Sequence, residues 1–143
     1  MKDVLYLQMM EMTKTALELN PVNKLVALLW HQGENDVVND VTYEYYYENL
    51  TKLINSVRET FGEIPFIAGN FVLDDWMKDY PIGCVNVIKA QRDICAGIGK
   101  AAFVETDGLE SNKINGNNDT VHFCREALNQ LGIRYFNAYN SIK

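Results

Sequence analysis

The sequence predicts an α/β protein in which helices cover both faces of a parallel sheet. Two observations lead to this class. Longer segments with helical spacing of apolar residues alternate with short, continuous apolar runs, and most of these runs lead into polar loops. A continuous apolar run of this length is typical of a strand buried on both faces, as in parallel sheets enclosed by helices. We therefore expect a single three-layer α/β/α domain over residues 1–143.

The first half of the chain predicts a helix, a strand and a second helix. Apolar residues recur at helical spacing over 5–19, and Asn20-Pro21 ends that helix. The run Leu-Val-Ala-Leu-Leu-Trp over 25–30 predicts a buried strand. A second helix over 42–61 gathers tyrosines and aliphatic residues on one stripe, and Gly62 suits the position just past its last turn.

The second half continues the alternation. Pro65 opens an apolar strand over 65–69, at a position where no ladder donor is needed. Helical spacing returns over 85–96, and a short strand follows at 101–104. A long polar loop then leads to a last helix over 124–138. Polar clusters past the carboxyl ends of such strands are where sites form.

Composition excludes several classes of partner. The formal net charge of −6 and a pI near 4.8 argue against nucleic acid. No basic run favours a membrane surface, and no apolar run is long enough to span a bilayer. Three cysteines at spacings that match no zinc or redox pattern predict buried thiols. We expect a cytoplasmic protein if Met1 is the true N-terminus, whereas an upstream segment would leave a secreted or periplasmic location open.

The first polar cluster follows the first predicted strand and reads Trp30-His31-Gln32-Gly33-Glu34-Asn35-Asp36. Gln32 and Asn35 each carry an amide NH₂ that can donate to an oxyanion. Gly33 would let the backbone come close to a ligand. The alternative is a loop that caps the next helix and ties itself down.

The second polar cluster, Asp119-Thr120-Val121-His122, lies just before the last predicted helix. An aspartate three residues before a histidine can accept from the imidazole Nδ1–H and leave Nε2 facing a cleft. That pair would be the base half of a Ser-His-Asp triad. The alternative is a solvated loop histidine near a helix N-terminus.

Two weaker signals remain. Trp76, in the loop after the second strand, is a candidate substrate wall or a cover for the core. A metal site is conceivable by ligand type from His31, Glu34, Asp119 and His122, but their spacing matches no helix-borne zinc motif, so we expect no metal. A different α/β binding module, such as a flavodoxin-like domain, would need a phosphate-binding loop, and none is found.

Both clusters resemble sequence blocks of the SGNH hydrolases, in the branch of the sialate O-acetylesterases and acetylxylan esterases. Residues 30–36 resemble that branch's Trp-x-Gln-Gly-Glu-Ser-Asp block. Residues 119–123 and 131–135 resemble its Asp-x-x-His-Phe and Leu-Gly-x-Arg-Tyr-Ala blocks. The resemblance implies the flavodoxin-like SGNH hydrolase fold and hydrolysis of acetyl esters on carbohydrates without a cofactor.

The resemblance also implies roles for individual residues. His122 would be the general base and Asp119 its orienting partner. The oxyanion donor would be Gln32 or Asn35, and the sequence does not distinguish between these two residues. The other members of the first cluster would support the site: His31, Gly33, Glu34 and Asp36.

The nucleophile of that family has no counterpart here. Its Gly-Gln-Ser-Asn-like or Gly-Asp-Ser-like block precedes the Gln-Gly-Glu block, whereas the only serines of this chain are Ser56, Ser111 and Ser141, none in a strand-to-helix elbow. We therefore expect a partial SGNH domain that lacks its first strand or strands and is inactive alone. The alternative is a truncated or decayed relative that at most binds carbohydrate.

A missing first strand has a physical consequence. The strand at 25–30 would lie at the edge of the sheet, and a long apolar edge promotes association. We expect the chain alone to be marginally stable, or to need another segment or chain along that edge.

Overall fold

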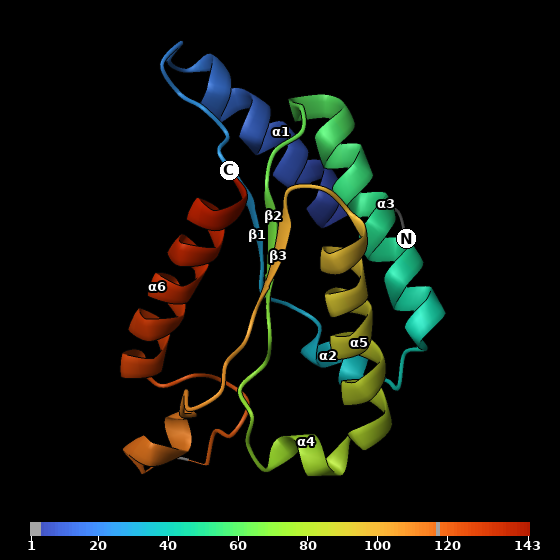
Figure 1. Ribbon diagram of the computed structural model, residues 1–143, viewed down its shortest axis with the longest axis vertical. Coiled ribbons are helices and arrows are strands. Elements are labelled where there is room, and N and C mark those ends of the chain that lie inside the picture. Colours follow the sequence, from blue (N-terminus) through green and yellow to red (C-terminus); the bar gives the residue numbers. More distant parts are fainter. Residues whose placement is uncertain (1–3, 117) are drawn as a thin grey trace.

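The computed structural model describes residues 4–116 and 118–143 and shows three parallel strands between two helical layers (Figure 1). The strands are β1 (Leu28–Trp30), β2 (Phe66–Gly69) and β3 (Ala101–Val104), in the order β1-β2-β3. Leu28 pairs with Phe66, and Phe66 pairs with Ala101. The predicted α/β class with a parallel sheet is confirmed.

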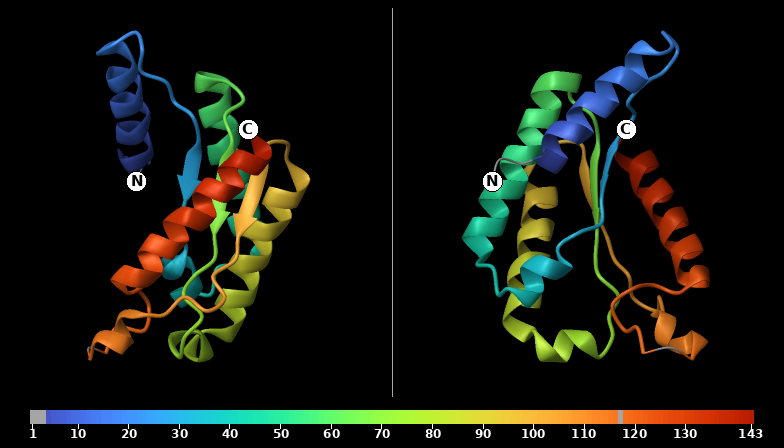
Figure 2. Two further views of the ribbon diagram at one scale, coloured as in Figure 1. Left: turned by 60° about the vertical axis from the view of Figure 1, so that its left-hand side comes forward. Right: turned by 180° about the vertical axis from the view of Figure 1, so that it is seen from behind.

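Helices cover both faces of this sheet. Figure 2 shows α6 (Arg125–Ile142) on one face, while α3 (Tyr43–Phe61) and α5 (Pro81–Gly97) pack together on the other. The helix α1 (Val4–Glu18) packs against α3 through a small cluster that includes Met10 and Val57. Short helices complete the fold: α2 (Glu34–Val38), α4 (Trp76–Asp79) and the 3-10 helix η1 (Asn112–Asn115).

The helix α3 forms for the reasons that its sequence predicts. Its stripe of buried residues consists of Tyr46, Leu50, Ile54 and Val57, at spacings of three and four. Thr42 caps its first turn by accepting a hydrogen bond from the Tyr45 backbone N–H at 3.3 Å. The helix is therefore fixed by one apolar face and one polar cap.

The middle strand β2 is the centre of the core. Phe66, Ile67 and Ala68 are fully buried, and a Cβ atom at Gly69 would lie 2.2 Å from the hydroxyl oxygen of Tyr135. Only glycine leaves room for that side chain of α6 against the sheet. This contact brings α6 close to the carboxyl end of the strands.

Some predicted boundaries differ from the structure. The first strand begins at Leu28 rather than at residue 25, because its partner begins at Phe66 and residues 25–27 extend beyond it. The helix predicted from residue 85 begins at Pro81, whose fixed φ suits a first helical turn. The helices α2 and α4 lie in segments that were expected to be loops.

The two edges of the sheet are built differently. At β3, the Arg92 guanidinium lies 5.1 Å from the centre of the Phe103 ring and pairs with Glu105 at 2.7 Å. At the other edge, Leu29 in β1 is 58% exposed, and Val26, just before the strand, is 56% exposed. Charged side chains protect natural sheet edges from association. Arg92 and Glu105 can protect the β3 edge in this way, whereas the apolar Val26 and Leu29 cannot protect the β1 edge.

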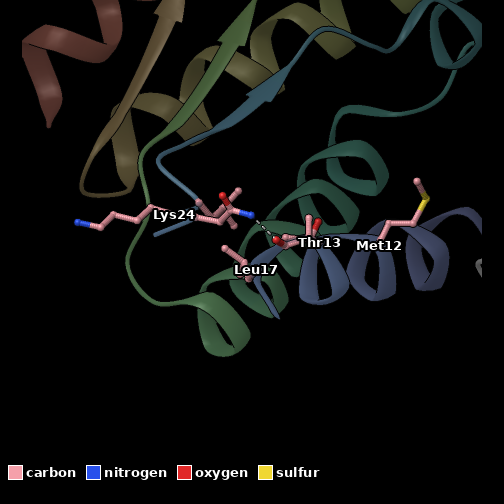
Figure 3. A pocket seen from close by; sticks show the side chains of 7 residues that line it. Met12, Thr13, Leu17 and Lys24 are labelled. Atoms are coloured by element: carbon pink, nitrogen blue, oxygen red, sulfur yellow. Dashed lines mark hydrogen bonds between the residues drawn. The ribbon is translucent and has the colours of Figure 1, made fainter. Parts of the chain in front are cut away.

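A shallow pocket lies between α1 and the segment that leads into β1. Figure 3 shows it lined by Met12, Thr13 and Leu17, with the Lys24 side chain extending away from it. The Asn23 side-chain amide donates to the Ala16 carbonyl at 2.7 Å and ties that segment to α1. Because residues 23–25 precede β1, this pocket lies at the opposite end of the sheet from the two polar clusters.

Candidate active site

The two polar clusters lie together at the carboxyl end of the sheet. The rings of His31 and Phe123 pack with centroids 5.5 Å apart and planes inclined at 51°. His31 belongs to the first cluster, and Phe123 directly follows the second. The topology therefore joins segments about ninety residues apart in sequence, as expected for loops past the ends of parallel strands.

The second cluster places a carboxylate against an imidazole. His122 Nδ1 lies 3.0 Å from each carboxylate oxygen of Asp119. A carboxylate accepts and cannot donate when ionised, so this geometry assigns the imidazole proton to Nδ1. The neutral ring then offers Nε2 as a base, and the His122 side chain is 73% exposed.

The Asp119 carboxylate is itself held by several donors. Its Oδ1 accepts from the backbone N–H groups of Val121 at 3.1 Å and His122 at 3.0 Å, and its Oδ2 accepts from the Asn112 amide at 3.1 Å. These hydrogen bonds, led by that from Asn112, lower the pKa of Asp119 to about 2. Asp119 is therefore ionised at neutral pH and orients the imidazole.

Asn112 was not identified from the sequence. It lies in the long polar loop, where no periodicity or spacing marks it. The structure shows why it reaches Asp119: Ser111 forms an antiparallel bridge with Phe123, and the Asn112 backbone N–H donates to the His122 carbonyl at 2.9 Å. The loop and the Asp119–His122 turn are thus paired backbone to backbone.

In the first cluster, the chain turns at Gly33. Its φ of 138° is rarely adopted by residues with side chains, and an added Cβ would lie 2.9 Å from Val87 Cγ1 and 3.0 Å from Phe71 Cζ. The lack of a side chain at Gly33 thus lets the backbone pack closely against core side chains. The turn lets α2 begin directly at Glu34.

Gln32 precedes this turn and is exposed. Its side-chain Nε2 donates to Asp36 Oδ2 at 3.0 Å. Asn35 is also exposed, one residue into α2. Both candidate side-chain amides are therefore accessible at the surface of this loop. The hydrogen bond to Asp36 orients the amide of Gln32.

His31 lies beside α6. The Tyr135 hydroxyl donates to the Trp30 carbonyl at 2.8 Å and lies 3.5 Å from His31 Nδ1. Desolvation lowers the pKa of His31, and the Glu34 carboxylate opposes this in part by raising it. The neutral form of His31 is therefore favoured.

Trp76 is part of the core. It is 5% exposed, its indole N–H donates to the Val72 carbonyl at 3.0 Å, and its ring packs edge-on against Phe71. Of the two interpretations of Trp76, this placement favours a cover for the core, because a substrate wall would present its ring to solvent. Among the described residues, no three or more His, Cys, Asp and Glu side chains gather as metal ligands would.

The three serine hydroxyls are engaged elsewhere. Ser56 bonds to the Tyr6 hydroxyl, and Ser141 donates to the Ala138 carbonyl. Ser111 donates to the Asp74 carboxylate and is 4% exposed. None of these hydrogen bonds involves His122, so they do not link any of the three serines to the Asp119–His122 pair.

In the part of the chain that the structure describes, no helix has the length and apolar character needed to cross a membrane.

Comparison with known proteins adds independent findings. The fold is similar to the crystal structure of a protein from Arabidopsis thaliana, with a TM-score of 0.77 and 26% sequence identity. The match covers 98% of this chain and 53% of that one, so this chain spans about half the length of its structural neighbour.

No curated protein matches the sequence significantly. The family model described as carbohydrate esterase, sialic acid-specific acetylesterase, matches residues 1–141. This match extends over nearly the whole sequence and includes both polar clusters. The chain therefore belongs to the carbohydrate esterase family of sialic acid-specific acetylesterases.

Proposed function

We propose that this chain provides the base and the oxyanion donor of a Ser-His-Asp esterase that removes acetyl groups from carbohydrates. The observation that carries the proposal is the His122–Asp119 pair, with Nδ1 held at 3.0 Å by an ionised carboxylate. Membership of a carbohydrate esterase family supports the substrate class. The serine comes from outside these 143 residues, which we propose form a partial domain.

The proposed chemistry is acyl transfer in two steps. His122 Nε2 takes the proton of the serine hydroxyl while the serine oxygen bonds to the acetyl carbonyl carbon. The tetrahedral oxyanion accepts a hydrogen bond from the amide of Gln32 or, alternatively, Asn35. The C–O bond to the sugar then breaks, and His122 returns the proton to the sugar oxygen.

The second step repeats this sequence with water. His122 takes a proton from water as the hydroxide attacks the acetyl-serine. The bond to serine breaks, the serine oxygen regains its proton from His122, and acetic acid leaves, giving its own proton to solvent to become acetate. Asp119 stabilises the imidazolium in both steps and stays ionised. The chemistry needs no cofactor.

We further propose that the segment carrying the serine pairs along β1. Three observations support this: the exposed side chains of Leu29 in that strand and Val26 just before it, the coverage of only 53% of the structural neighbour, and a hollow at the end of β1. The hollow is lined in part by Trp30, Gln32 and Tyr46, so a segment beside β1 would reach the candidate oxyanion donor.

The test of function is hydrolysis of p-nitrophenyl acetate. We expect the 143-residue chain to be no more active than its His122→Ala variant, and the longest polypeptide that the gene encodes to be active. In that polypeptide, His122→Ala should lower kcat by about 10⁴-fold or more, since it removes the base of the triad. Thermal unfolding is the control, because the exposed His122 side chain contributes little to stability.

Other outcomes distinguish the alternatives. Activity of the 143-residue chain that depends on His122 would mean that a nucleophile is present in it. A longer polypeptide that binds acetylated sugar without hydrolysing it would favour the non-catalytic relative.

The pairing along β1 has its own test by size-exclusion chromatography and urea unfolding. We expect the isolated chain to self-associate and unfold at low urea, and Leu29→Lys to reduce the association. A monodisperse monomer that unfolds cooperatively would contradict the pairing.

A further inference from the structure

We propose that Gln91 and Tyr46 are positioning residues for Gln32: from inside the core, they hold the peptide group that carries the candidate oxyanion donor. Neither belongs to the two polar clusters. The catalytic consequence of this proposal rests on the proposed esterase function, whereas its structural part does not.

The hydrogen bonds converge on one carbonyl oxygen. Gln91 Nε2 donates to the Gln32 carbonyl at 2.9 Å, and the Tyr46 hydroxyl donates to the same oxygen at 3.2 Å. Gln91 extends from α5 and Tyr46 from α3, so two helices hold this single loop carbonyl.

The Tyr46 hydroxyl is fully used in this arrangement. It accepts from Trp30 Nε1 at 3.2 Å and from Gln91 Nε2 at 2.9 Å, while its one proton goes to Gln32. A hydroxyl has one proton and two lone pairs, so no further partner is needed. Burial raises the pKa of Tyr46 to about 12, which keeps that proton in place at neutral pH.

The buried position of Gln91 is energetically unfavourable for its amide group. It is fully buried, and its Oε1 has no hydrogen-bond partner among the described protein groups. A buried amide with an unpaired oxygen is destabilising compared with an apolar side chain of similar shape. What the Gln91 amide contributes is the Nε2 donor. The orientation of the amide follows from this contact, because exchanging its oxygen and nitrogen would place an oxygen against the Gln32 carbonyl oxygen.

Holding this carbonyl limits the freedom of Gln32 itself. On one side, Tyr135 fixes the Trp30 carbonyl; on the other, Gly33 is packed against the core. With the backbone held before, at and after Gln32, only the side-chain torsions stay free, and Asp36 accepts from the amide at 3.0 Å. Such preorganisation is what an oxyanion donor requires.

The structural part is tested with Gln91→Met, which keeps the length of the side chain and removes the donor. The background is the 143-residue chain with Leu29→Lys, which reduces self-association. We expect the NMR order parameters of the Gln32 and Gly33 backbone amides to fall from about 0.85 toward about 0.6, with no loss of melting temperature. The control is Thr51→Val, which removes the other unpaired buried side-chain oxygen of the described residues and should leave the loop unchanged.

A Gln91→Met chain that keeps a rigid loop would overturn the proposal. Equal loosening in Thr51→Val would also overturn it, since the effect would then be a general one of core polarity. Tyr46→Phe provides a second route to the same loop: we expect it to loosen Gln32 too, because the carbonyl loses its other donor.

The catalytic part is tested in the longest polypeptide that the gene encodes. There, Gln91→Met should lower kcat for p-nitrophenyl acetate by about 10- to 100-fold at unchanged KM, as expected for a misplaced oxyanion donor. A loosened loop with unchanged kcat would overturn the role of Gln91 in positioning a donor. An inactive wild-type polypeptide would instead contradict the esterase function and leave the loop measurement standing.

Discussion

The two halves of the candidate site are held in different ways. The loop of the first cluster depends on distant elements, because its carbonyl groups accept from Gln91, 59 residues from Gln32, and from Tyr135, 105 residues from Trp30. The Asp119–His122 turn is held mainly by its own backbone and by Asn112, seven residues from Asp119. The first cluster thus requires the complete fold, whereas the second cluster carries most of its geometry locally.

The largest expected effect comes from adding one methyl group to each half. Gly33→Ala should lower the free energy of unfolding by about 2–4 kcal/mol, because it combines backbone strain with overlap against Val87. Gly116→Ala, close to the second cluster, should cost about 1 kcal/mol, since φ is 79° there but the space is open. Urea denaturation measures both, and equal costs would contradict the comparison.

A smaller effect is expected from pH. Because its hydrogen bonds lower the pKa of Asp119 from 3.8 to about 2, the stability that they provide is complete above about pH 4 and is lost as pH falls toward 2. Asp119→Asn should therefore unfold more easily than the wild type at neutral pH, and this difference should shrink below pH 4.

The control for this pH series is Asp79→Asn, which changes an exposed carboxyl far from the second cluster in sequence. It should leave the pH dependence unchanged. A difference between Asp119→Asn and the wild type that stays constant down to pH 2 would show that the carboxylate charge does not stabilise this turn.

The smallest expected effect concerns the histidine of the first cluster. An NMR titration should give His31 a pKa below its ordinary 6.5, because partial desolvation of the imidazole opposes its charge. Glu34→Gln should lower that pKa further by removing a nearby negative charge. Glu44→Gln, at the start of α3, serves as the control, and a rise of the pKa in Glu34→Gln would contradict the described environment.

Much of the fold could be predicted because it follows from local patterns. The run 101–104 is the strand β3 as predicted, and the buried stripe of α3 matches its helical spacing. The helix α2 was missed since five residues are too few for a periodicity. The pairing of Asp119 with His122 follows from a spacing of three residues, and the structure places them in contact.

The residues that hold the first cluster were beyond sequence patterns. Tyr46 was assigned to the buried stripe of its helix, which is correct, but nothing in that stripe indicates the partner of its hydroxyl. Gln91 is a single polar residue on a mostly apolar face. Its contact depends on how α5 packs beside α3, and this tertiary arrangement is not encoded in either segment alone.

The contact between Tyr135 and the first cluster has a consequence for the order of folding. The Tyr135 hydroxyl occupies the space beside Gly69 and reaches the Trp30 carbonyl, 105 residues earlier in the chain. A ribosome makes the loop at 31–36 long before it makes Tyr135, and contacts of such wide sequence separation close late. The loop of the first cluster in a newly made chain should therefore stay mobile until the last helix docks, so that assembly of the candidate site marks the end of folding.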